Sequence, residues 1–233
     1  MTHLSSYQRW IPFLLLMVML AAFFYFRLYH YLNFESLATH RQLLLQWTHD
    51  HYVLTVMSYI LFYTFAVAAS VPGAVFFTLT GGFLFGLWLG TFYAVLSATC
   101  GATLLFVAIR LAFFDWFKAK TAHWLKQMEQ GLQNHAFYYL LTLRFIPLFP
   151  FWLVNAIPAL LGIPLSTFFF ATLIGIIPGA FIYASIGHGL STVFDKHQTP
   201  NLNILFQANI LLPLLGLALL SLLPVIYKHY KKK

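Results

Sequence analysis

The sequence predicts an all-α polytopic membrane protein: an inverted repeat of two re-entrant hairpins, each followed by a transmembrane helix, with flanking transmembrane helices. Three observations predict it: the composition, the proline and glycine breaks in the apolar segments, and the placement of the basic residues. Of 233 residues, 61% are hydrophobic and 8% are charged, whereas about a quarter of a typical soluble domain is charged. A chain this apolar cannot cover a globule with polar surface, which excludes a soluble single domain.

The first region, 1–51, is expected to anchor the chain. An apolar run at 11–26 follows Arg9 and lacks a small-residue cleavage site, which indicates an uncleaved anchor helix. Residues 27–51 mix four histidines with leucines and Trp47, a pattern typical of an interfacial helix.

The first hairpin is expected at 72–85, after a transmembrane helix at 52–71. This stretch is apolar, yet Pro72-Gly73 opens it and Gly81-Gly82 interrupts it. Non-helical backbone at membrane depth must be buried in protein or line a cavity, and a re-entrant hairpin meets that condition. The next transmembrane helix is expected over 86–110.

The second hairpin is expected at 144–163. It follows a charged, aromatic-rich stretch at 111–135, which predicts a surface helix that ends at Gly131. Arg144 interrupts a half-length apolar run, and three prolines then deny a continuous helix. These prolines are Pro147, Pro150 and Pro158. Transmembrane helices are expected at 164–187 and 202–227, which gives a membrane domain over 52–190 and a C-terminal helix with a basic tail over 191–233.

An internal repeat links the two hairpins. A shift of 78 residues places Pro72 on Pro150 and Gly101 on Gly179. Basic residues favour the cytoplasmic side, so the basic loop and the basic tail both predict cytoplasmic segments. An even number of crossings then separates them, and the two hairpins enter from opposite sides, as in many secondary transporters. The C-terminus is expected in the cytoplasm, while the orientation of the N-terminus stays open.

Several motifs occur together in order: Pro72-Gly73, the run 79–86, Gly101-Ala102, the run 143–151 and Gly175 to Gly179. Together they resemble the DedA superfamily, and most closely its SNARE-associated or VTT-domain branch, over about residues 50–190. The resemblance implies two inverted re-entrant hairpins and movement of lipids across the bilayer. Relatives are linked to polyprenyl-phosphate recycling in bacteria and to phospholipid scrambling in eukaryotes.

Two departures from the family pattern concern proton coupling. Proton-coupled members carry acidic residues in or near the first hairpin, but this chain has none between Asp50 and Asp115. Many members also carry a second arginine where this chain has Pro150. Both departures argue against coupling through a buried carboxylate.

Three residues are expected to bind the substrate: Arg144, Arg110 and Asn155. A cation within an apolar stretch is costly and suggests a function, and a guanidinium can hold a phosphate through two parallel hydrogen bonds. The alternatives are that Arg144 caps hairpin carbonyls or snorkels, that Arg110 snorkels, and that Asn155 satisfies broken backbone. Seven further residues are expected to shape the hairpins rather than contact substrate: Pro72, Gly73, Gly81, Gly82, Pro147, Pro150 and Gly179.

Other site classes find little support. The tightest histidine cluster, His49-Asp50-His51, fits no zinc signature, so neither metal nor cofactor is expected. No Ser-His-Asp set or carboxylate pair indicates an enzyme. The net charge of +8 lies beside apolar segments, which favours anionic headgroups over nucleic acid. The single cysteine, Cys100, offers no disulfide.

The favoured function is a flippase or scramblase for phosphate-bearing lipids such as polyprenyl phosphate or phospholipid. One alternative is a transporter or channel for small solutes or ions, and the other is a membrane organiser that transports nothing. The short tails are typical of a bacterial inner membrane protein. The oligomeric state, the lipid and the energy source stay open.

Overall fold

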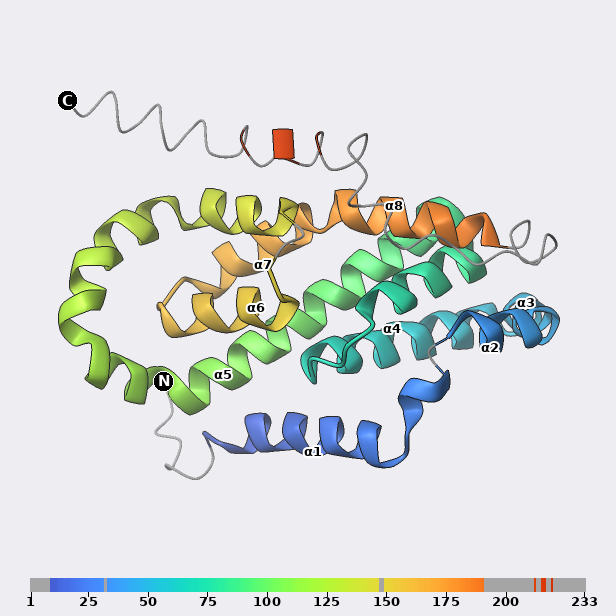
Figure 1. The fold of residues 1–233 in the computed structure, drawn as a ribbon, viewed down its shortest axis with the longest axis horizontal. Helices are drawn as coiled ribbons and strands as arrows, with labels where there is room; N and C mark the ends of the chain where they lie inside the picture. Colours follow the sequence, from blue (N-terminus) through green and yellow to red (C-terminus); the bar gives the residue numbers. More distant parts are fainter. Residues whose placement is uncertain are drawn as a thin grey trace. The chain divides into compact units, whose positions relative to one another are not determined.

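The computed structural model describes residues 9–31, 33–146 and 149–190, together with Leu212, Leu215, Gly216 and Leu219 (Figure 1). All regular structure in these residues is helical, as the sequence predicts. The elements are α1 (Ile11–Tyr25), η1 (Leu28–Tyr31), α2 (Phe34–Thr39), α3 (Arg41–Asp50), α4 (Tyr52–Ala68), α5 (Ala74–Phe145), α6 (Phe151–Leu160), α7 (Leu165–Gly175) and α8 (Ile177–His188). The helix expected at 202–227 and the basic tail lie outside the described residues, apart from those four positions.

The chain divides into two compact units that interleave along the sequence. Unit 1 comprises Met1–Met17, Ala102–Ile176 and Phe206–Lys233. Unit 2 comprises Val18–Gly101 and Ile177–Leu205. Each unit contains one of the two expected hairpins.

In unit 2, the chain reverses direction inside α5. Gly86 has φ +79°, and a Cβ atom at Gly90 would lie 2.5 Å from the carbonyl oxygen of Gly81. Nine residues of straight helix would separate these two positions by about 13 Å, so Ala74–Phe85 must fold back on the residues that follow Gly86. The expected break at Gly81-Gly82 is therefore wrong. Both glycines are helical, and their lack of a side chain permits close packing instead.

Helices α4 and α8 hold this first hairpin arm. The hydroxyl of Tyr59 donates to the carbonyl oxygen of Phe77 at 3.0 Å, and the hydroxyls of Tyr63 and Thr78 lie 2.7 Å apart. On the α8 side, a Cβ atom at Gly82 would overlap the backbone of Ala184. Tyrosine hydroxyls and glycine contacts thus fix the arm from two helices.

In unit 1, α6 and the turn after it lie in the region expected as the second hairpin, and α7 follows as the first half of the helix expected over 164–187. Pro150 caps α6, and Gly162 supplies the turn with φ +73°. Pro158 was expected to break the chain, but it lies within α6, and its carbonyl accepts a hydrogen bond from the amide of Ile163 at 3.2 Å. Pro147 lies outside the described residues.

Helix α5 also extends further than the sequence predicts. It continues through Gly131, the expected helix end, and finishes at Phe145. A glycine in a helix interior costs only about 1 kcal/mol, which the rest of a long helix can offset. Arg144 therefore lies in the last turn of α5 rather than inside the second hairpin.

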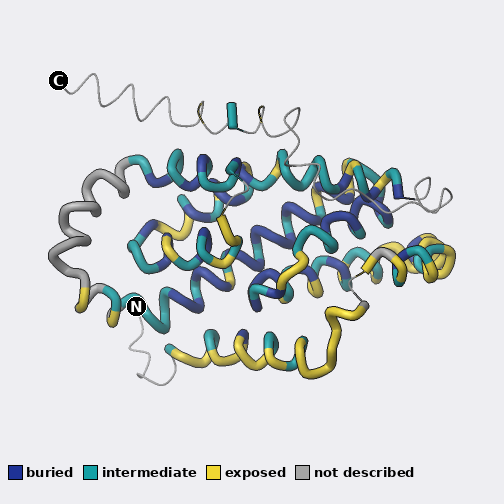
Figure 2. Tube along the Cα trace, viewed as in Figure 1, coloured by how far each residue is buried: buried dark blue, intermediate teal, exposed yellow. Residues whose placement is uncertain are grey.

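Within the described ranges, two helices are long and apolar enough to cross a membrane: Ala74–Phe114, which contains the reversal at Gly86, and Leu165–His188. The pair α3 and α4, bent by 115°, would make a third span. Helix α1 is shorter, and its apolar side chains are largely exposed (Figure 2), including Leu14, Leu15 and Val18. Such exposed apolar faces suit contact with lipid. The inverted repeat and the re-entry of the hairpins stay predictions.

Candidate functional site

Arg144 joins two helices of unit 1 through one nitrogen. Its Nη2 donates to Oδ1 of Asn155 on α6 at 2.6 Å and to Oγ1 of Thr172 on α7 at 2.9 Å. Asn155 and Thr172 are almost completely buried. The structure thus brings together two of the three expected site residues, Arg144 and Asn155.

Aromatic rings and a glycine surround the Arg144 side chain. Its Cζ lies 5.2 Å from the ring centre of Phe151 and 5.5 Å from that of Phe168, within the range of cation–π attraction. A Cβ atom at Gly175 would lie 2.5 Å from Cβ of Arg144. The absence of a side chain at Gly175 therefore makes room for the arginine stem.

Two buried donors at this site have no hydrogen-bond partner among the described residues. They are Nε of Arg144 and Nδ2 of Asn155. An unsatisfied buried donor costs about 1–3 kcal/mol, and more when it carries charge. The two acceptors of Nη2 are neutral, so they do not offset the charge of Arg144. Anionic oxygens are the acceptors that suit such donors and a guanidinium charge.

Arg110, the third expected site residue, has a different contact. Its Nη1 donates to the carbonyl oxygen of Ile163, in the turn between α6 and α7, at 2.8 Å. Its Cζ lies 5.3 Å from the ring centre of Phe114 and 5.7 Å from that of Phe106. This contact ties α5 to the turn of the second hairpin and does not join the cluster around Arg144.

A stacked aromatic pair lies between the two arginines. The rings of Phe106 and Phe168 are 4.4 Å apart with an interplanar angle of 28°, and both side chains are fully buried. Arg110 contacts the first ring and Arg144 contacts the second. The stack therefore fixes α7 against α5 next to both cations.

The residues expected to shape the hairpins have varied surroundings. Pro72 and Gly73 precede α5, and Gly73 has φ +106°, a conformation that favours glycine. Gly179 lies in α8, and no described atom beyond its chain neighbours and its own helix backbone lies within 4 Å of the position that its Cβ would take. That the seven residues shape the hairpins and do not contact a substrate stays a prediction.

Sequence reasoning missed Thr172 as part of the site. The available signal was weak: a polar residue in an apolar helix, one turn before Gly175 and one turn after Phe168. A threonine in such a helix commonly bonds back to its own backbone. Only the fold shows that its hydroxyl accepts from Arg144.

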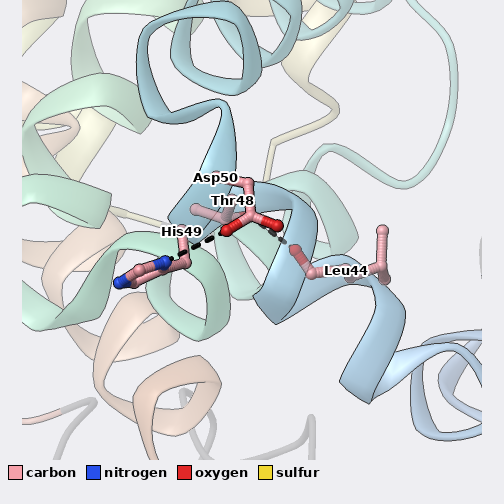
Figure 3. Close-up of polar contacts among 4 residues, drawn as sticks. All are labelled: Leu44, Thr48, His49 and Asp50. Atoms are coloured by element: carbon pink, nitrogen blue, oxygen red, sulfur yellow. Dashed lines mark hydrogen bonds and ion pairs between the residues drawn. The ribbon is translucent and has the colours of Figure 1, made fainter.

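The His49-Asp50-His51 cluster has no metal-site geometry. Nδ1 of His49 lies 3.2 Å from Oδ1 of Asp50 on the exposed end of α3 (Figure 3). The neighbouring Thr48 hydroxyl donates to the carbonyl oxygen of Leu44 at 2.7 Å. Within the described part of the chain, no group of three or more metal-ligating side chains occurs.

A sequence model of the VTT domain matches residues 71–189, which contain both hairpins and the cluster around Arg144. The chain belongs to the VTT-domain family. This family lies within the DedA superfamily, so the resemblance drawn from the hairpin motifs is confirmed.

Curated relatives of this VTT-domain protein include the Transmembrane protein 41 homolog of Dictyostelium discoideum. It is 32% identical over 208 residues, which cover 86% of this chain and 59% of that protein. Transmembrane protein 41B of Gallus gallus and that of Homo sapiens are each 27% identical over 186 residues, which cover 78% of this chain. The matched residues cover 66% of the Gallus gallus protein and 62% of the Homo sapiens protein. The chain thus spans between 59% and 66% of the length of these relatives. No solved structure matches.

The relatives are named as transmembrane proteins, and this VTT-domain protein has apolar helices long enough to span a bilayer. It is therefore an integral membrane protein, as the composition predicts.

Proposed function

We propose that this VTT-domain protein moves phosphate-bearing lipids across the bilayer and that Arg144 receives the headgroup. The observation that carries the proposal is a pair of buried donors that have no hydrogen-bond partner among the described residues, Nε of Arg144 and Nδ2 of Asn155, in a site where both acceptors of the guanidinium are neutral. Phosphate oxygens accept hydrogen bonds from such donors in charge-assisted, shorter and stronger contacts. The family resemblance supports lipid as the source of the phosphate.

The site suits a headgroup better than a whole lipid. Apolar and aromatic side chains surround Arg144, while the described helices expose apolar faces elsewhere. The acyl or prenyl chains would stay in the bilayer as the headgroup passes the half-buried Arg144. No carboxylate partner is needed in this arrangement, in keeping with the acid-free sequence between Asp50 and Asp115.

The proposed orientation has a cytoplasmic C-terminus and hairpins that enter from opposite sides, in a bacterial inner membrane. The positively charged loop and tail support it. A reporter that works only in the cytoplasm should show activity when it is fused after residue 233 and also when it is inserted within residues 121–130. Activity at only one of these two positions would show that the assumed crossing number is wrong.

The test of function is transport in liposomes that contain the purified protein. A fluorescent phospholipid or polyprenyl phosphate in the inner leaflet should become accessible to an external quencher. The R144Q variant should slow this movement by about 100-fold, because it removes charge-assisted hydrogen bonds worth roughly 3 kcal/mol. R27Q is the matched control, since Arg27 is exposed outside the site.

Two results would contradict the proposal. Lipid movement at the wild-type rate in R144Q would remove Arg144 from the path. Flux of an inorganic anion without any lipid movement would assign the same donors to a solute pathway.

A further inference from the structure

One face of α7 follows the Arg144 side chain along its whole length. Phe168, Thr172 and Gly175 lie at positions i, i+4 and i+7, which share one face of a helix. All three are buried. None of them is charged, and Thr172 alone offers a side-chain hydrogen-bonding group.

Each of these three residues contacts a different part of Arg144. Gly175 faces the stem, where a Cβ atom would lie 2.5 Å from Cβ and 2.9 Å from Cγ of the arginine. Thr172 accepts from Nη2 at 2.9 Å. The ring of Phe168 lies beside Cζ at 5.5 Å. The arginine therefore lies lengthwise along α7 instead of projecting freely from α5.

The hydrogen bonds occupy one nitrogen of the guanidinium and leave the Nε–H donor beside it without a partner among the described residues. Nη2 has two N–H groups, and Thr172 and Asn155 accept from this nitrogen. Nε remains without a partner among the described residues. Holding Nη2 in place thus leaves the Nε–H donor for a ligand.

We infer that Thr172 and Gly175 are positioning residues: together they form a track on α7 that orients Arg144 for an anionic oxygen. Gly175 admits the stem and Thr172 fixes the rotation of the guanidinium. This inference rests on the proposed function for its ligand, a phosphate group, but the geometry of the track can be tested without transport.

The variants are T172V, which removes the acceptor at nearly constant volume, and T172S, which keeps it. T91V is the matched control, because the Thr91 hydroxyl donates to the carbonyl oxygen of Leu87 in its own helix at 2.6 Å. Dioleoyl phosphatidic acid serves as the probe in native mass spectrometry. T172V should bind it about tenfold more weakly, whereas T172S and T91V should bind it as the wild type does.

A second measurement reports the arginine directly. The NMR signal of Arg144 Nε–Hε, assigned by its loss in R144K, should shift and broaden in T172V but not in T172S or T91V. G175A should change the same signal, since the added Cβ displaces the arginine stem. Wild-type affinity and an unchanged signal in T172V would overturn the inference, as would a T172S variant that behaves like T172V.

The two arms separate this inference from the proposed function. If the wild type neither binds nor moves phosphatidic acid but T172V and G175A still alter the Arg144 signal, the proposed ligand is wrong and the track stands. If the wild type binds and moves lipid but T172V changes nothing, the track is wrong and the proposed function stands.

Discussion

Nη1 of Arg110 donates a hydrogen bond to the carbonyl oxygen of Ile163, 2.8 Å away. The two residues belong to different parts of unit 1: Arg110 lies in α5, and Ile163 lies in the turn that joins α6 to α7. A turn carbonyl has no partner within a helix ladder, so this arginine satisfies it. The contact gives Arg110 a role in holding the second hairpin.

Replacement of Arg110 should therefore destabilise the second hairpin. R110Q loses a charge-assisted hydrogen bond to a turn carbonyl, worth about 1.5–3 kcal/mol. We expect a lower melting temperature in detergent. The measurement is the fluorescence of Trp152 in a protein background that keeps only this tryptophan. K120Q is the control, because Lys120 is exposed and its Nζ lies 4.7 Å from the ring centre of Trp116. An unchanged melting temperature in R110Q would show that the contact contributes nothing to stability.

The sequence predicts the helices of the fold better than its turns. A helix is found at Ile11–Tyr25 within the run expected at 11–26, although it is too short to count as a span, and the expected helix at 52–71 is found as Tyr52–Ala68. The length of an apolar run in the sequence predicts where such a helix lies. The turn of the first hairpin was misplaced because Gly81, Gly82 and Gly86 look alike in the sequence. Only the tertiary structure distinguishes Gly81 and Gly82, which allow close packing of a neighbouring element, from Gly86, which has positive φ.

The site was predictable in part for a similar reason. Arg144 stands out because a cation in an apolar stretch is costly, and Asn155 is polar within a proline-broken segment. Thr172 could not be chosen from sequence, since its partner lies 28 residues away on another helix. The contact of Arg110 with Ile163 could not be predicted from the sequence either, because its acceptor is a backbone carbonyl and every residue type has one.

Replacement by alanine should change the stability of the protein differently at two glycines of α8. A Cβ atom at Gly187 would overlap the backbone of Leu79, whereas a Cβ atom at Gly179 would meet nothing within 4 Å. We expect G187A to destabilise unit 2 by roughly 1–3 kcal/mol, since neither backbone can yield easily. G179A should be neutral or slightly stabilising, because alanine favours helix over glycine. The measurement is the melting temperature of both variants in one detergent. Equal effects would contradict the close packing of α8 on the first hairpin arm.

A second pair tests the backbone at two turns. Ser70 has φ +56° and Gly86 has φ +79°, in the region where a side chain costs about 1–2 kcal/mol. S70G should therefore raise the melting temperature, and G86A should lower it. The nearest atom to a Cβ at Gly86 is Nδ1 of His188 at 4.0 Å, so a clash does not account for the loss. A G86A variant as stable as the wild type would show that the chain does not reverse through a left-handed residue there.

The sharpest test of the site keeps its shape and changes one charge. N155D replaces the amide oxygen that lies 2.6 Å from Nη2 of Arg144 with a carboxylate oxygen. The variant should fold, because the two side chains have nearly the same volume and the new group gains an ion pair. The internal carboxylate then neutralises the arginine and repels a phosphate. We expect at least tenfold weaker binding of phosphatidic acid and slower lipid movement, at unchanged or higher melting temperature.

The matched control for this change is N33D. Asn33 caps α2, where its Oδ1 accepts from the amide of Ser36 at 2.7 Å, and aspartate caps a helix about as well as asparagine. N33D adds the same negative charge outside the site, so it should leave lipid binding and movement as in the wild type. If N155D bound phosphatidic acid as tightly as N33D does, the charge of Arg144 would not be what recognises the headgroup. A joint loss in both variants would point instead to the net charge of the protein and would contradict a local site.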